Sequence, residues 1–216
     1  MRYLIALIAV LLAVFGFAQR ASAVTSPGFY GYYVSGSTYS STTADWTMPS
    51  FTCGAKATTY VSIWTGLDGL TSDTTEQIGA EVDCAGGTAD YYGWYDLYPG
   101  PVQTFASKLS PGDKLEASVT WDAGEKFTLT LEDVTAGWDK TVTASQTSTP
   151  ARSSAETFVE VPNTLACAPA ETLASFTGDT VNGKTLGSLD PTEQNSGDPN
   201  ITVSAVSAET FKVTCK

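Results

Sequence analysis

The chain has 216 residues, with 11 Lys and Arg, 23 Asp and Glu and no His, so its formal net charge is −12 at pH 7. That length favours a single domain. The acidic balance excludes a basic nucleic-acid-binding face. The lack of histidine excludes Ser–His–Asp and Cys–His catalysis and any zinc site held by histidine. The 32 threonines and 19 glycines favour strands and turns over helices.

The first 23 residues are predicted to be a secretory signal peptide. Arg2 supplies the positive start, residues 4–18 are an apolar stretch too short to span a bilayer, and Ala21-Ser22-Ala23 forms a cleavage site. No second apolar stretch of membrane length follows. We therefore expect a secreted, extracellular protein whose residues 24–216 form one domain and do not associate with a membrane.

The strands are predicted from alternating apolar and polar residues. Leu115, Ala117 and Val119 face one way while the polar residues between them face the other. Turn-forming residues separate runs of this kind. Strands are expected at about 28–35, 41–48, 58–68, 74–83, 90–98, 115–121, 127–132, 138–146, 156–161 and 201–214, and the stretch 165–200 is expected to form loops. Short strands without intervening helices predict an all-β antiparallel sandwich.

The four cysteines can pair in three ways if the protein is exported to an oxidising compartment. Pairing Cys53 with Cys84, and Cys167 with Cys215, keeps both loops local, and this is the pairing we predict. No Cys-x-x-Cys motif occurs, so these cysteines are not expected to bind a metal ion. The triplet Asn200-Ile201-Thr202 is an N-glycosylation sequon.

Four predicted strands place aromatic rings beside carboxyl or amide groups on one face. Because side chains alternate along a strand, each of the following sets shares one side. The sets are Ser62, Trp64, Gly66 and Asp68; Gln77, Gly79, Glu81 and Asp83; Tyr92, Trp94, Asp96 and Tyr98; and Glu156, Phe158 and Glu160. Aromatic walls with a few polar groups are typical of ligand clefts. Partly exposed aromatics at a sheet rim would give the same pattern.

Several motifs in a fixed order resemble the glutamic peptidases, or eqolisins, which are acid endopeptidases. The motifs are Trp64–Gly69, Gln77–Glu81, Tyr92–Pro99, Ser110–Asp113 and Ala155–Glu160. The resemblance extends from about Phe29 to the C-terminal strand. It implies a concanavalin-like antiparallel β-sandwich of two seven-stranded sheets, and it implies that Gln77 and Glu156 are the catalytic pair.

The pattern and the resemblance together suggest the residues that contact substrate. These are Trp64, Asp68, Glu81, Trp94, Asp96, Tyr98 and Tyr30. The chain departs from the family at two places. Tyr30 is expected to replace a tryptophan of the substrate wall, and Thr157 replaces the aromatic residue that often follows the catalytic glutamate.

Without histidine, a carboxylate that activates a water molecule is the simplest route to peptide hydrolysis. Glu156 is expected to act first as the base and then as the acid, while the Gln77 amide donates to the water and the oxyanion. A hydrogen bond from Gln77 to Glu156 is expected to favour the charged carboxylate. We expect a monomer that acts on protein or peptide substrates in acid, is insensitive to pepstatin, and has no metal, cofactor or nucleic-acid partner.

Two other functions fit the same residues. In a carbohydrate-binding, lectin-like module, aromatic side chains of one strand would stack on sugar rings; the candidates are Tyr91, Tyr92, Trp94, Tyr95 and Tyr98. In a glycosidase, Glu81 and Glu156 would serve as the acid and the nucleophile, with carboxyl groups about 5–9.5 Å apart. The relative positions of the Gln77 and Glu156 side chains distinguish these two functions from a peptidase.

Overall fold

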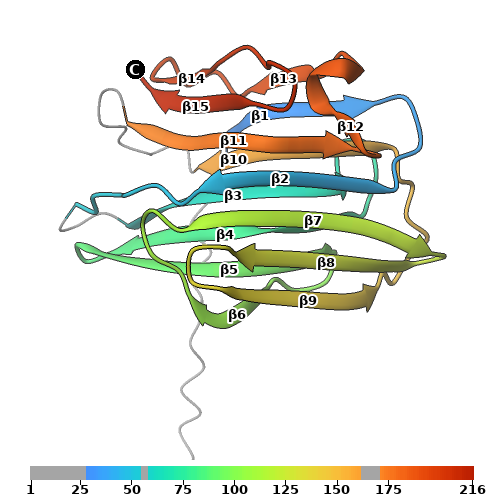
Figure 1. The fold of residues 1–216 in the computed structure, drawn as a ribbon, viewed down its shortest axis with the longest axis horizontal. Helices are drawn as coiled ribbons and strands as arrows, with labels where there is room; N and C mark the ends of the chain where they lie inside the picture. The colour runs from blue at the N-terminus through green and yellow to red at the C-terminus, as the bar shows by residue number, and fades with distance from the viewer. Residues whose placement is uncertain (1–27, 55–57, 162–170) are drawn as a thin grey trace, which may run out of the picture.

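The protein is a sandwich of two antiparallel sheets whose strands run in nearly the same direction (Figure 1). The computed structural model describes residues 28–54, 58–161 and 171–216, so the predicted signal peptide and Cys167 lie outside the described residues. The seven-stranded sheet contains, in spatial order, β13 (Thr192–Asn195), β1 (Gly28–Ser35), β10 (Ser154–Val161), β3 (Thr58–Asp68), β4 (Thr75–Ala85), β5 (Thr88–Tyr98) and β6 (Gln103–Lys108).

The second sheet has eight strands. Its order is β14 (Ile201–Val203), β15 (Phe211–Cys215), β11 (Thr172–Val181), β2 (Ser41–Thr47), β7 (Lys114–Ala123), β8 (Lys126–Asp133) and β9 (Trp138–Ser145), and β12 (Lys184–Thr185) pairs with β11. The short 3-10 helix η1 spans Leu186–Leu189. In the described part of the chain, no helix is long and apolar enough to cross a membrane.

The predicted fold class is confirmed, with local corrections. The second sheet has eight strands rather than seven, and β6 was not predicted. The stretch 165–200 was wrongly expected to form only loops, because it contains β11, β12 and β13, and the predicted strand 201–214 is two strands, β14 and β15. A register shift between Thr177 and Thr180 interrupts the alternation in β11, which explains why that strand was missed.

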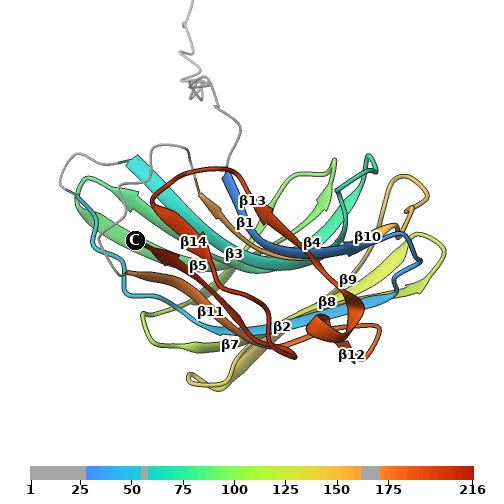
Figure 2. The ribbon, with the colours of Figure 1, turned by 90° about the horizontal axis from the view of Figure 1, so that it is seen from above.

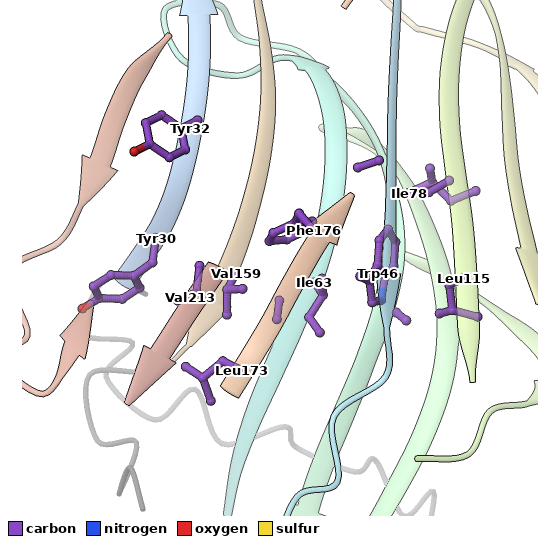
Figure 3. Close-up of a cluster of buried hydrophobic side chains, with 14 of the residues drawn as sticks. Tyr30, Tyr32, Trp46, Ile63, Ile78, Leu115, Val159, Leu173, Phe176 and Val213 are labelled. Atoms are coloured by element: carbon purple, nitrogen blue, oxygen red, sulfur yellow. The ribbon is translucent and has the colours of Figure 1, made fainter. Parts of the chain in front are cut away.

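The core lies between the sheets and follows the predicted alternation. Leu115 and Val119 are buried, as are Phe127, Leu129 and Leu131 of the neighbouring strand. Figure 3 shows how side chains from both sheets meet, with Ile63 and Val159 from one sheet near Phe176 from the other. Burial of each large apolar side chain contributes about 1.5–3 kcal/mol relative to exposure.

A disulfide fastens the chain segment after β2 to the end of β4. Cys53 and Cys84 are bonded, with their Cα atoms 5.4 Å apart, which confirms this predicted pair. Cys215 is also disulfide-bonded. Its predicted partner, Cys167, lies outside the described residues, so the second pair stays a prediction.

Candidate active site

The outer face of the seven-stranded sheet brings the predicted polar and aromatic residues into rows. The strands of this sheet curve, with the concave side turned away from the other sheet (Figure 2). In the first row, Glu156 of β10 is opposite Gly66 of β3, which is opposite Gln77 of β4. Asp96 of β5 continues this row. The four mixed strand faces predicted from the sequence therefore form one continuous surface.

Gly66 separates the two predicted catalytic residues. Neighbouring strands are about 4.8 Å apart, so the backbones of Glu156 and Gln77, two strands apart, are separated by roughly 10 Å. A Cβ atom at Gly66 would lie 3.0 Å from the Gln77 Cβ and 3.0 Å from the Glu76 carbonyl oxygen. Glycine therefore leaves open the space into which the carboxyl and the amide project.

These side chains line a pocket of about 330 Å³. Gln77 and Glu156 both border it, as do the predicted substrate-binding residues Trp64 and Asp68. The remaining lining residues are Phe29, Gly69, Leu70, Thr75, Phe158, Glu160 and Gln194. The pocket therefore has an apolar wall, several acidic or amide groups, and no cationic side chain in its lining.

The apolar wall is a cluster of three rings. Trp64 and Phe158 are directly opposite in the second row and meet edge to face, with ring centroids 5.4 Å apart. Phe29 of β1 packs against both, at 6.4 Å from Trp64 and 6.0 Å from Phe158. Edge-to-face contacts of this kind hold aromatic rings in fixed orientations. The pocket therefore offers a rigid apolar surface beside the Gln77–Glu156 row.

The surroundings of Glu156 favour its uncharged form, contrary to the expectation of a charged carboxylate. The residue is 3 % exposed, and neither carboxyl oxygen has a hydrogen-bond partner. Burial raises the pKa of Glu156 well above its usual range; the Ser154 hydroxyl partly opposes this shift, and the acidic neighbours Asp68 and Glu76 add to it. The physical reason is that an ionised carboxylate in a buried site without a cation is costly.

Gln77 contacts a different carboxyl from the one expected. Its Nε2 atom donates a hydrogen bond to Asp96 Oδ2 at 3.4 Å. Among the described residues, Gln77 makes no hydrogen bond to Glu156. Burial raises the pKa of Asp96, and this hydrogen bond partly opposes the shift. Asp96 therefore holds the Gln77 amide beside the pocket without lining the pocket itself.

Asp68 has a structural role that the sequence did not reveal. Its carboxylate accepts hydrogen bonds from the backbone amides of Arg152, at 2.6 Å, and Ser153, at 2.7 Å, and from the Ser153 hydroxyl at 3.1 Å. The side chain borders the pocket but is fully buried. Because the bonds made by Asp68 fix the segment that leads into β10, we assign it to positioning the Glu156 strand rather than to substrate contact.

The expectation for Tyr30 was wrong. Its ring is 2 % exposed and lies in the core between the sheets (Figure 3). Phe29 lines the pocket instead. The sequence did contain a signal for this, since Tyr30, Tyr32 and Val34 form an apolar alternating set, which is typical of the buried face of a strand.

Three other predicted substrate-binding residues lie on the same sheet face but outside the pocket lining. Trp94 is buried against Trp64 and Phe158, and its indole N–H donates to the Ser62 hydroxyl at 3.1 Å. Glu81 accepts a 2.6 Å hydrogen bond from the Tyr92 hydroxyl, and burial raises the pKa of Glu81 to about 7. Tyr98, at the end of β5, is 54 % exposed.

The geometry does not favour the two alternative functions. Tyr91 is a core residue and Tyr95 stacks on Phe105 at 5.6 Å, so the aromatic residues of β5 do not form one exposed strip. Glu81 is four residues from Gln77 along β4, roughly 13 Å, and β4 is two strands from β10. The Glu81 and Glu156 carboxyl groups therefore do not share the pocket that a glycosidase pair requires.

Sequence reasoning missed pocket residues from outside the four mixed strands. Gln194 belongs to β13, within the stretch expected to form loops, and Leu70 lies between β3 and β4. The sequence pattern around Leu70 does not predict that this residue lines a pocket. Gln194 reaches the pocket only because β13 pairs with β1, a contact between segments far apart in the sequence.

The fold and the pocket indicate the class of protein to which the chain belongs. A β-sandwich of two antiparallel sheets is the fold of the glutamic peptidases, and four solved structures of that class share it. The Peptidase A4 family model matches residues 27–213, and the chain belongs to this family.

Individual relatives agree with the family assignment. The chain is 26 % identical over 140 residues to aspergillopepsin-2 of Aspergillus niger, covering 56 % of this chain and 50 % of that relative, so it spans about half the relative's length. The structure resembles scytalido-glutamic peptidase bound to a transition-state analogue, with a TM-score of 0.74, 23 % identity, and coverage of 88 % of this chain and 99 % of the other.

Two further solved structures show the same fold. SCP-B, an eqolisin in complex with the tripeptide Ala-Ile-His, has a TM-score of 0.68 and 22 % identity, with coverage of 88 % of this chain and 99 % of the other. The aspergilloglutamic peptidase of Aspergillus niger has a TM-score of 0.62 and 25 % identity, with coverage of 73 % and 99 %.

Proposed function

We propose that the protein is a secreted, acid-active glutamic endopeptidase in which Glu156 and Gln77 hydrolyse peptide bonds. The observation that carries the proposal is that both side chains border one pocket, on either side of Gly66 and beside an aromatic wall. The family supports peptide hydrolysis as the reaction, and SCP-B was solved with a peptide bound. The substrates proposed here are proteins and peptides.

The free oxygens of Glu156 suggest how the reaction proceeds. A protonated carboxyl has one donor and one acceptor oxygen, and neither is occupied here. As water attacks the carbonyl carbon, one oxygen of Glu156 accepts a proton from the water. The other oxygen gives its proton to the amide nitrogen as the C–N bond breaks. Glu156 thus ends with the one proton it began with.

Gln77 supplies the complementary interaction. Gln77 borders the same pocket as Glu156, and its amide can donate to the oxyanion that forms when water attacks. Asp96 fixes the amide by accepting one of its hydrogen bonds. Loss of a donor of this kind costs about 2.7–4 kcal/mol of transition-state stabilisation in other hydrolases.

The direction of the Glu156 pKa shift predicts activity in acid. The reactive form is protonated, so activity is present below the raised pKa of Glu156 and is lost as the pH rises through that pKa. Pepstatin and chelators should have no effect, because the proposed mechanism uses neither an aspartate pair nor a metal ion.

The test is digestion of denatured haemoglobin or casein across acidic and neutral pH by the purified protein and its variants. E156A should lose nearly all activity, and Q77A should lose roughly 100- to 1000-fold in kcat. E132A is the matched control, because Glu132 is exposed on the second sheet, outside the residues that line the pocket. Parental activity in E156A would contradict the assignment.

A further inference from the structure

A chain of buried hydroxyl groups connects the back of the Glu156 strand to the opposite sheet. The Thr65 hydroxyl donates to the backbone carbonyl oxygen of Glu156 at 2.9 Å and lies 3.2 Å from the Thr157 hydroxyl. Thr157 in turn donates to Asp179 Oδ1 at 3.2 Å. Thr65, Thr157 and Asp179 are at most 2 % exposed, so the chain lies wholly within the sandwich.

The backbone of β11 is shaped so that Asp179 faces inward. The register with β2 shifts between Thr177 and Thr180, and Gly178 between them has a φ of 61°. A side chain at Gly178 would collide with the Asp45 carboxylate. Bulges of this kind redirect a side chain and are frequent beside active sites. The bulge is therefore what brings a carboxyl group into the core behind Glu156.

The surroundings of Asp179 favour its uncharged form. Its second oxygen, Oδ2, has no hydrogen-bond partner, and the one salt bridge in the described residues joins Lys108 and Asp90, elsewhere in the molecule. The acidic residues near it are Asp45 on β2 and Glu209, whose carbonyl oxygen accepts from the Asp179 amide. Burial raises the pKa of Asp179 well above its usual range, and Asp45 adds to the shift. The uncharged form of Asp179 is therefore favoured, with Oδ1 paired to the Thr157 hydroxyl.

We infer that Thr65, Thr157 and Asp179 form a positioning network that holds the backbone of Glu156 from behind. The inference rests on the proposed catalytic role of Glu156. Because the Glu156 carboxyl has no partner in the pocket, its placement depends on the backbone of β10. Thr65 binds that backbone at Glu156 itself, and Asp179 anchors the next residue, Thr157, to the second sheet.

The first test is T157V, which removes one hydroxyl and keeps the side-chain shape. We expect kcat to fall roughly 10- to 100-fold while KM stays within about twofold, because a misplaced catalytic group slows the reaction without weakening binding. The pH at which activity is lost should also move lower, because a looser β10 leaves Glu156 less buried. Circular dichroism at 25 °C checks that the variant is folded.

The matched control is T130V. Thr130 also forms a threonine pair, with its hydroxyl 3.1 Å from that of Thr141, and this pair joins β8 to β9, away from the Thr65–Asp179 network. T130V should leave kcat and the pH profile as in the parent. T157V with parental kcat and an unchanged pH profile would overturn the inference even if its Tm fell.

D179N tests the uncharged state. Asparagine has the same size, keeps an oxygen to accept from Thr157 and cannot ionise, so it should retain the parental kcat. The protonated form of Asp179 is favoured in the native state, so the parent loses stability as the pH rises above the unfolded-state pKa of about 3.9. The Tm of D179N should therefore exceed that of the parent by a margin that grows with pH. A margin that shrinks with pH would show that Asp179 is ionised.

A measurement independent of catalysis separates this inference from the proposed function. The pKa of Glu156 can be followed by carbon-13 NMR of its side-chain carboxyl in the parent, T157V and T130V. A lower Glu156 pKa in T157V alone supports the network even if the parent proves inactive, in which case only the peptidase assignment fails. The same pKa in all three proteins, with an active parent, rejects the network.

Discussion

Asp68 shows how one side chain can serve the site without touching substrate. Its carboxylate receives two backbone amides and one hydroxyl from residues 152–153, immediately before β10. The adjoining Arg152 is itself fixed, with its guanidinium 3.6 Å from the centre of the Trp121 ring. The sequence predicted that Asp68 contacts substrate in the cleft. Its hydrogen-bond partners in the structure show instead that it holds the segment before β10.

The prediction at this scale is for D68A. Loss of the charged acceptor leaves two half-buried amides without partners, so the free energy of unfolding should fall by about 1.5–3 kcal/mol. The entry to β10 should loosen, and kcat should fall as well. Urea unfolding followed by tryptophan fluorescence measures the first effect. D73N, at an exposed position of the same loop region, is the control. Equal stability of D68A and D73N would contradict the role of Asp68 in holding residues 152–153.

At the scale of elements, β10 is central. It pairs with β1 on one side and β3 on the other, and it carries both Glu156 and Phe158 toward the pocket. Its inward side chains pack in the core or join the hydroxyl network, so the same strand builds the site and the interior. Gly31 of β1 has a φ of 153°, and a Cβ atom there would collide with the Thr157 carbonyl oxygen, so glycine permits this close pairing.

The disulfide between the β2 end and β4 gives the prediction for elements. Cys53 and Cys84 are 31 residues apart in sequence. In the chain-entropy account, a loop of that length stabilises the fold by about 3.5–4 kcal/mol. The double variant C53S/C84S should therefore lose stability of that order in urea unfolding, with peptide cleavage retained at low temperature. Ordinary point mutations lower the free energy of unfolding by about 1 kcal/mol on average. A loss of stability smaller than this in the double variant would contradict the chain-entropy account.

At the scale of the whole molecule, the raised pKa values of several carboxyl groups favour stability in acid. Burial raises the pKa of the buried Glu76 to about 8, and of the half-buried Glu81 and Asp45 to about 7 and about 6. Their protonated forms are therefore favoured in the native state. The chain also has only 11 Lys and Arg, so protonation of the acids produces little positive self-repulsion.

These facts predict how stability changes with pH. Because the native pKa values exceed the unfolded values of about 3.9–4.3, stability is greatest near pH 3–4 and falls as the pH rises toward about 8. Circular dichroism melts at about pH 3.5 and pH 7, in matched ionic strength, should give the higher Tm in acid. A Tm that falls steeply toward pH 3.5 would mean that the native state needs ionised carboxylates.

The sequence by itself determined the strands that build the site and which of their residues share a face, because alternation is a local property of extended backbone. Together with the resemblance to glutamic peptidases, that pattern placed Gln77, Glu156, Trp64 and Asp68 on one surface, and all four line the pocket. The tertiary structure decided the rest. Tyr30 lies in the core, Asp68 binds backbone amides, and a bulge turns Asp179 inward. Burial and hydrogen-bond partners depend on segments distant in the chain, and a local pattern does not encode them.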